Sequence, residues 1–193
     1  FVMMMLVDMA HEGLVVFPTH RLLRDFPSFD EEALLQGCSE YFTVERREDT
    51  DTMEAVLTDL YNEGKKAFGY YGGGSDWVLL TLKDLSVMEK ALPGKSAASQ
   101  GLDVSVLHSL ILERVLGIDA ENMAKQINLT YTRSFEEAMD SVREKKSQCA
   151  FILNPTRVTE IRDVAAAGEK MPQKSTYFYP KLITGLVMNK MDF

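Results

Sequence analysis

The side chains best suited to chemistry on a small anionic molecule lie in three short polar segments. They are His20 and Arg21, Asn154 and Thr156, and Lys174, Ser175 and Thr176. Arginine can hold a carboxylate or a phosphate through two parallel hydrogen bonds, and histidine can act as a general base or a phosphate ligand. Each segment adjoins an apolar run, and binding residues of α/β proteins collect at the ends of strands. These residues are therefore the predicted ligand-binding or anion-binding groups.

The segment Gly168–Ser175 nearly matches the phosphate-binding loop G-x-x-x-x-G-K-[ST]. Gln173 stands where the second glycine should be, although that glycine lets the backbone fold around phosphate. The predicted order is also reversed, with a helix before the segment and a strand after it. We reject a nucleotide loop here. Lys174, Ser175 and Thr176 can still donate to an anion, and the alternative is a plain surface loop that leads into a strand.

Catalytic residues and metal ligands are not evident in this sequence. The chain has three histidines, at 11, 20 and 108, and two cysteines, at 38 and 149, and they do not have the spacing of zinc ligands. We expect no metal site. His108 falls on the inner stripe of a predicted helix and is interpreted as a core residue. Carboxylates are numerous, but no pair has the character of an acid–base couple, so the catalytic residues are unknown.

Composition excludes several classes of partner. The net charge is −8 and the pI is about 5.0, which argues against nucleic acid and against anionic lipid surfaces. No apolar run reaches the roughly 18 residues of a membrane span. Cys38 and Cys149 are expected to be buried free thiols, as in a reducing compartment. We therefore predict a cytoplasmic protein that binds neither nucleic acid nor membrane.

The elements that must position these residues predict an α/β fold of the mixed, α+β kind, with helices packed on a mixed sheet. The apolar runs Phe1–Val7 and Leu14–Phe17 are interpreted as an N-terminal hairpin. A second hairpin is expected around the glycine run Gly72–Gly74. Near the C-terminus, strand-like Ile127–Thr132 and Cys149–Leu153 flank a helix, which is typical of a βαβ-like unit.

We expect residues 1–193 to form a single α/β domain, because neither half has obvious capping of its apolar strands. The small, polar stretch Gly94–Gly101 is the one place where a sub-division is plausible. The chain starts at Phe1, inside an apolar run and without a methionine. We therefore expect a fragment of a larger protein.

Five segments of the chain together resemble the bacterial "domain of unknown function 1015" family. The most specific are Val16–Arg21 (VFPTHR) and Met171–Leu182 (MPQKSTYFYPKL), and the others are Phe1–Val7, Val104–Leu110 and Asn154-Pro155-Thr156. The resemblance covers essentially the whole chain, as the C-terminal portion of the family. An Asp-Gly-His-His-Arg stretch that marks the family lies upstream of these segments and is missing here.

That missing stretch resembles the motif of the ParB-like/sulfiredoxin-like fold, which includes kinases of free serine. The resemblance implies a transferase that acts on a small phosphorylated or carboxylated metabolite. The reactive motif would lie in an upstream domain of the same protein, and this chain would supply an anion-binding wall. It implies no cofactor in this fragment and a nucleotide in the full-length protein. The alternative is a non-catalytic structural or oligomerisation domain, such as a homodimer.

Overall fold

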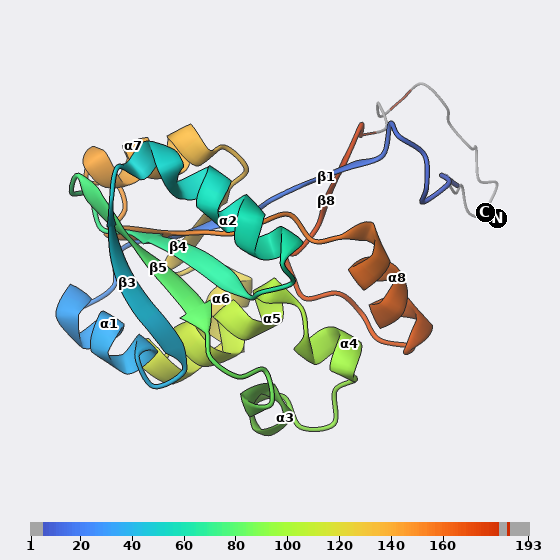
Figure 1. The fold of residues 1–193 in the computed structure, drawn as a ribbon, viewed down its shortest axis with the longest axis horizontal. Coiled ribbons are helices and arrows are strands. Elements are labelled where there is room, and N and C mark those ends of the chain that lie inside the picture. Colours follow the sequence, from blue (N-terminus) through green and yellow to red (C-terminus); the bar gives the residue numbers. More distant parts are fainter. Residues whose placement is uncertain (1–5, 182–184, 186–193) are drawn as a thin grey trace, which may run out of the picture.

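The computed structural model describes residues 6–181 and residue 185 (Figure 1). Its strands are β1 (Val15–Phe17), β2 (His20–Leu23), β3 (Phe42–Glu48), β4 (Ala67–Tyr71), β5 (Asp76–Leu82), β6 (Leu129–Thr132), β7 (Cys149–Ile152) and β8 (Tyr177–Tyr179). Its α-helices are α1 (Glu31–Cys38), α2 (Met53–Asn62), α3 (Val87–Ala91), α4 (Ala97–Gln100), α5 (Asp103–Val106), α6 (Ala120–Lys125), α7 (Phe135–Arg143) and α8 (Val158–Ala166). A 3-10 turn, η1 (Thr50–Thr52), precedes α2, and a π-helix, η2 (Leu107–Val115), continues α5.

Six strands form one sheet in the order β3-β5-β4-β7-β2-β6. Strand β2 lies between β7 and β6 and is antiparallel to both, so β6 and β7 run parallel to each other. Helix α7 connects those two strands, which makes the predicted βαβ-like unit a split one with β2 inserted. The hairpin around Gly72–Gly74 is formed by β4 and β5. The mixed α+β fold is therefore confirmed, and its sheet joins strands from both sides of residues 94–101.

Helices cover both faces of this sheet (Figure 1). Helices α2 and α7 pack on one face through Met53, Leu57 and Met139. Helix α1 and the α5–η2 helix pack on the other face, where Leu34, Leu107 and Ile111 are among the buried residues. Side chains of a strand alternate between the two faces, so each strand contributes to both cores. In β2, Leu23 belongs to the α1 side and Leu22 to the α7 side.

A two-stranded ribbon stands beside the sheet. Strand β1 pairs with β8 in antiparallel register, with Val16 opposite Phe178. The ring of Phe17 packs against Tyr179 at 5.7 Å between ring centroids, edge to face. The predicted hairpin partner, Phe1–Val7, lies outside the described residues except for Leu6 and Val7, which are not in a strand. Among the described residues, the aromatic β8 is the strand that pairs with β1.

The spacing of polar residues in the sequence predicts helix N-caps at Ser28, Asp51, Asp103 and Ser134, and only the cap at Ser134 is confirmed. Ser134 accepts a 3.2 Å hydrogen bond from the backbone N–H of Glu137 at the start of α7, as the spacing predicts. Asp103 does not cap its helix, because Leu102 holds the N-cap position. The Asp103 carboxylate is buried instead and lies 2.8 Å from the ammonium of Lys66.

Candidate functional site

Arg21 is fully buried, and its guanidinium contacts four other residues. It donates to the backbone carbonyl of Thr19, and to the carbonyl of Lys174 at 3.0 Å. The guanidinium also lies 3.3 Å from Nε2 of the His108 imidazole. The guanidinium also lies over the ring of Tyr131, 5.4 Å from its centroid. Tyr131 stands directly opposite Arg21 in the β2–β6 register, which places both side chains on the same face of the sheet.

Burial without a counter-ion is the main electrostatic property of Arg21. Within the described part of the chain, no carboxylate forms an ion pair with it, and burial lowers its pKa to about 10. A group with that pKa still carries its charge at neutral pH. An uncompensated buried charge costs several kcal/mol. The structure therefore places a positive charge in a dry environment where an anion would be strongly attracted.

His20 is also buried, but alternation along β2 directs it to the opposite face from Arg21. Its Nδ1 accepts a 3.3 Å hydrogen bond from the backbone N–H of Leu153. Burial and the neighbouring Arg21 charge lower the His20 pKa to about 4, so the ring is neutral at pH 7. Because Nδ1 accepts, Nε2 carries the proton, and it has no partner among the described residues.

The Lys174 segment is held next to Arg21 by hydrogen bonds from side chains to backbone carbonyls. Thr156 donates a 2.9 Å hydrogen bond to the carbonyl of Ser175, and the buried Ser175 hydroxyl donates to Pro172 at 2.6 Å. Lys174 adopts a left-handed φ of 56°, and its carbonyl receives the Arg21 hydrogen bond. The side chains of Thr156 and Ser175 thus shape the loop, whereas the Lys174 side chain is exposed.

Asn154 is turned away from this group. Its side-chain amide donates a 2.9 Å hydrogen bond to the carbonyl of Leu57, at α2 on the opposite face from Arg21. The structure therefore brings together five of the seven predicted site residues, namely Arg21, Thr156, Lys174, Ser175 and Thr176. His20 and Asn154 lie close in sequence to this group but are engaged elsewhere.

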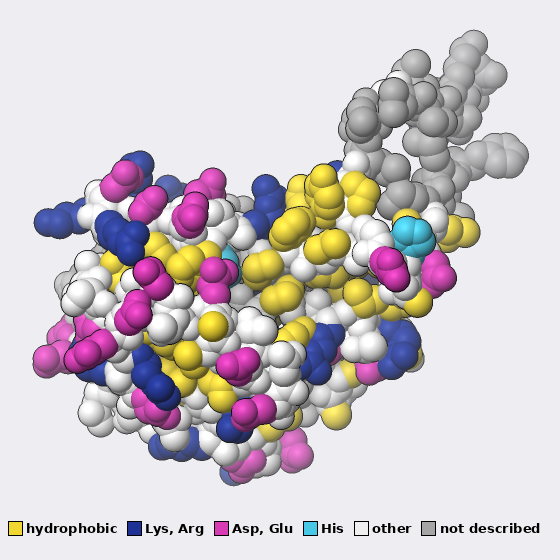
Figure 2. All heavy atoms as spheres, turned by 45° about the horizontal axis from the view of Figure 1, so that its top comes forward, with side chains coloured by type: hydrophobic (Ala, Val, Ile, Leu, Met, Phe, Trp, Pro, Cys, Tyr) yellow, Lys and Arg dark blue, Asp and Glu magenta, His cyan; other side chains and the backbone are white. Residues whose placement is uncertain are grey.

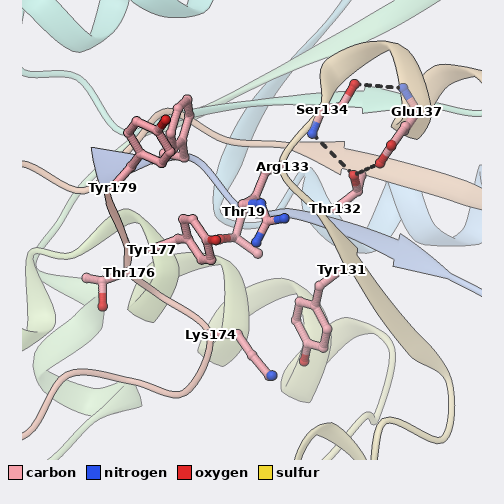
Figure 3. A pocket seen from close by; sticks show the side chains of 11 residues that line it. Thr19, Tyr131, Thr132, Arg133, Ser134, Glu137, Lys174, Thr176, Tyr177 and Tyr179 are labelled. Carbon is pink, nitrogen blue, oxygen red and sulfur yellow. Dashed lines mark hydrogen bonds between the residues drawn. The ribbon is translucent and has the colours of Figure 1, made fainter. Parts of the chain in front are cut away.

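An open cavity of about 670 Å³ lies over Arg21, and we call it the tyrosine pocket (Figure 3). Its lining includes Thr19, Tyr131, Arg133, Lys174, Thr176 and Tyr177. Arg21 is directly behind this lining, through its contacts with Thr19, Tyr131 and Lys174. The volume falls within the range of small-molecule sites.

The tyrosine pocket combines aromatic rings with cations and hydroxyl groups. The guanidinium of Arg133 covers the ring of Tyr177 at 3.9 Å from the centroid. Glu137 provides the acid in the lining, and its carboxylate accepts from Thr132 in the network drawn in Figure 3. Rings can stack on a planar group, while the ammonium of Lys174 and the guanidinium of Arg133 can bind phosphate or carboxylate. The arrangement suits an anion that carries a flat or apolar part.

Sequence reasoning missed Thr19, Tyr131, Arg133 and Tyr177. A usable signal existed at Tyr131-Thr132-Arg133, because an aromatic, a hydroxyl and a cation end a predicted strand there. What the sequence does not show is the pairing of β1 with β8 and of β2 with β6, which together bring these residues to one place.

Two general features bear on the kind of site. Over the residues that the structure describes, histidine, cysteine, aspartate and glutamate do not gather in groups of three that could hold a metal ion. Among the same residues, no helix is both long enough and apolar enough to span a membrane.

The fold is a mixed α+β sheet whose strand-end residues surround a cationic, tyrosine-lined cavity. Residues 1–105 match the model of a family described as a protein of unknown function (DUF1015). The chain belongs to this family. No curated protein matches it.

Two kinds of solved structure are similar to the chain. A free serine kinase in complex with AMP has 16% sequence identity and a TM-score of 0.49. The match covers 89% of this chain and 56% of the kinase. A conserved hypothetical protein from Pyrococcus furiosus has 19% identity and a TM-score of 0.48, with 89% and 59% coverage. The chain therefore spans less than two thirds of the length of either protein.

Proposed function

We propose that this chain is part of a small-metabolite phosphotransferase, comparable to a kinase of free serine, and that it supplies the anion-binding wall of the site. The tyrosine pocket binds the phosphorylated or carboxylated ligand, with a nucleotide as the first candidate. Arg133 and Lys174 contact the anion, and Arg21 contributes its charge from behind. The groups that react with the ligand belong to another part of the same protein.

The buried, unpaired charge of Arg21 carries this proposal. Among the described residues, no carboxylate pairs with the Arg21 cation, so its burial lowers the stability of the fold. A bound anion would compensate this charge. Two further cations, Arg133 and Lys174, line the cavity directly in front of it. Tyr131 and Tyr177 offer rings for a base, and the hydroxyls of Thr19 and Thr176 offer donors.

Isothermal titration of the full-length protein and of this chain with ADP, AMP, serine and phosphoserine tests the proposal. A ligand at about a hundred times its Kd adds about 2.7 kcal/mol of stability, so thermal shift gives a second readout. We expect ADP or AMP to bind, with a weaker response for this chain alone. We expect Lys174→Met and Arg133→Met each to weaken binding by about tenfold or more, as for loss of a charged hydrogen bond.

Matched controls come from the distant edge of the sheet. Arg47 is an exposed arginine on β3, the edge strand farthest from β2 and β6 in the sheet order, and Lys65 is an exposed lysine before β4. Arg47→Met and Lys65→Met should leave nucleotide binding unchanged. If all four variants behave alike, or if neither nucleotide binds the full-length protein, the proposal is wrong.

A second candidate function is a structural or oligomerisation domain that forms a homodimer. Hydrophobic side chains gather on one face toward the end where β1 and β8 lie (Figure 2). Val15, Phe17 and Tyr179 of this ribbon are 43%, 37% and 53% exposed. Large apolar residues that stay exposed together mark interaction surfaces.

Light scattering of the chain distinguishes the two candidates. An interaction domain gives a dimer mass that returns to the monomer mass in a Val15→Thr/Tyr179→Thr variant. A strict monomer at every concentration removes this second candidate and leaves the nucleotide-binding proposal intact.

A further inference from the structure

Tyr131 also lines a second, smaller cavity. Its volume is about 310 Å³, and we call it the serine pocket. It is bounded by the α5–η2 helix, by the start of α6 and by residues 170–173. Tyr131 lines both cavities, and Gln173 of this one adjoins Lys174 of the tyrosine pocket in sequence. The two cavities are therefore neighbours that share one wall.

The α5–η2 helix turns three polar side chains to this cavity. Its other residues from Val104 to Leu112 are buried and apolar, whereas Ser105, His108 and Ser109 line the serine pocket. Both serines are 4% exposed. The hydroxyl of Ser99, which also lines the pocket, donates a hydrogen bond to Glu169. The hydroxyls of Ser105 and Ser109 have no hydrogen-bond partner among the described residues. π-Helical segments occur often at functional sites, and here one forms the polar wall.

The protonation of His108 adds a third donor. Arginine can only donate, so the 3.3 Å contact with Arg21 makes Nε2 of His108 the acceptor. Burial, reinforced by the Arg21 charge, lowers the pKa of His108 to about 3, so the ring is neutral at pH 7. The neutral ring therefore carries its proton on Nδ1, and this N–H belongs to a residue that lines the serine pocket.

Charged residues complete the lining with an excess of cations. Lys95 and Lys170 contribute two ammonium groups, and Glu113 contributes one carboxylate. Burial raises the pKa of Glu113 above its ordinary value. Two hydroxyls, an imidazole N–H and two ammonium groups form a donor-rich cavity, which suits a carboxylate. Glu113 can accept from a hydroxyl of the same ligand. Leu92 and Met123 are the apolar part of the wall.

We propose that the serine pocket binds a small hydroxylated carboxylate, held by Ser105, Ser109 and the Nδ1–H of His108. Its volume is at the low end for ligand sites, which limits the ligand to a few carbon atoms. The inference goes beyond the proposed function, because this binding requires neither a nucleotide nor a transfer reaction. If both are right, the two ligands lie in neighbouring cavities that share Tyr131.

Three probes of similar size separate the chemical requirements of the site. Glycerate has both a carboxylate and hydroxyl groups, propionate lacks the hydroxyls, and glycerol lacks the carboxylate. We expect isothermal titration to show that glycerate binds about tenfold or more tighter than propionate or glycerol. Each of these two probes lacks one kind of group and therefore loses the hydrogen bonds of that group. Absence of glycerate binding, or glycerol binding equally well, overturns the proposal.

Two variants from different elements locate the site. Ser109→Ala removes one hydroxyl, and Ala120→Trp fills the cavity from its exposed rim on α6. We expect about a fivefold to tenfold loss of glycerate affinity for the first and no measurable binding for the second. Ser141→Ala on α7 and Ala165→Trp on α8 are the matched controls and should bind as the wild type does. If Ser109→Ala does not fold, Ala120→Trp decides, because Ala120 is exposed.

Titration of the same variants with ADP distinguishes this inference from the proposed function. Ser109→Ala should bind ADP as the wild type does, and Lys174→Met should bind glycerate as the wild type does. Glycerate binding without ADP binding would leave this inference standing and end the nucleotide proposal. Glycerate binding that is unchanged in both Ser109→Ala and Ala120→Trp would place the ligand elsewhere and end this inference.

Discussion

The guanidinium of Arg21 donates a 3.0 Å hydrogen bond to the backbone carbonyl of Lys174, 153 positions later in the chain. This contact ties strand β2 to the loop before β8. It also places the Lys174 side chain at the mouth of the tyrosine pocket. One buried side chain thus sets the position of a loop and the charge behind a cavity, and these two roles can be separated experimentally.

Replacement of Arg21 by methionine should cost binding more than stability. The variant loses the hydrogen bonds to Thr19 and Lys174, but it also removes a buried charge that has no described counter-ion. We expect the free energy of unfolding to change by less than about 2 kcal/mol, because these effects offset each other. ADP affinity should fall by about tenfold or more. Urea unfolding and titration calorimetry measure the two quantities. A large loss of stability with intact binding would assign Arg21 to the fold alone.

Stability should decrease as the pH falls below about 6.5. His20 and His108 have folded-state pKa values of about 4 and about 3, below the unfolded value of 6.5. The unfolded chain therefore binds protons first, and acid favours unfolding. Each histidine adds a slope of up to about 1.4 kcal/mol per pH unit between pH 6.5 and its folded pKa. Urea unfolding at pH 5, 6 and 7 measures the slope, which His20→Gln and His108→Gln should each reduce. A wild-type slope in both variants would contradict the prediction.

The ring of Tyr177 should contribute to ligand binding through Arg133, which covers it at 3.9 Å. Without the ring, the guanidinium loses the surface that orients it over the pocket. We expect Tyr177→Leu to weaken ADP binding by about threefold to tenfold, the size of a partly desolvated cation–π contact. Tyr177→Phe keeps the ring and should bind nearly as the wild type does. Arg157 covers Tyr61 at the same 3.9 Å outside the pocket, so Tyr61→Leu is the control for a general effect.

The adjacent lysines 65 and 66 should differ sharply in their effect on stability. The ammonium of Lys66 lies 2.8 Å from Asp103 and 3.2 Å from Glu160, largely shielded from water. Lys66→Met leaves two carboxylates without their cation, and we expect a loss of about 3–5 kcal/mol. Lys65→Met removes only an exposed pair with Glu63 and should change stability by less than about 1 kcal/mol. Equal losses in urea unfolding would show that the Lys66 cluster is not the cause.

Local patterns in the sequence predicted the elements that are formed by residues close together in the chain. The glycine run led to the β4–β5 hairpin, Ser134 to the start of α7, and the flanking apolar runs to β6 and β7. Strand β2 was missed, because His20 and Arg21 are polar and do not resemble a buried strand. Both are nevertheless buried, since backbone and imidazole partners far along the chain satisfy them.

The candidate site was predictable in its residue types and less so in its geometry. Position beside an apolar run identified Arg21 and Lys174, which the structure joins by a hydrogen bond. Neighbours in sequence need not share a site, because alternation along β2 sends His20 to the other face. The serine pocket gave no signal in sequence, since Ser105 and Ser109 are ordinary residues until a helix and a loop enclose them.

The placement of β7 also has a consequence for biosynthesis. Strand β7 separates β4 from β2 in the sheet, although both of those strands come much earlier in the chain. The ribosome therefore synthesises β2 and β4 well before β7, the strand that lies between them. Until β7 is available, each of the two strands has an unpaired edge. Such long-range pairing slows folding and leaves the nascent chain prone to association. Chaperone dependence during translation should consequently persist until residue 152 has left the exit tunnel.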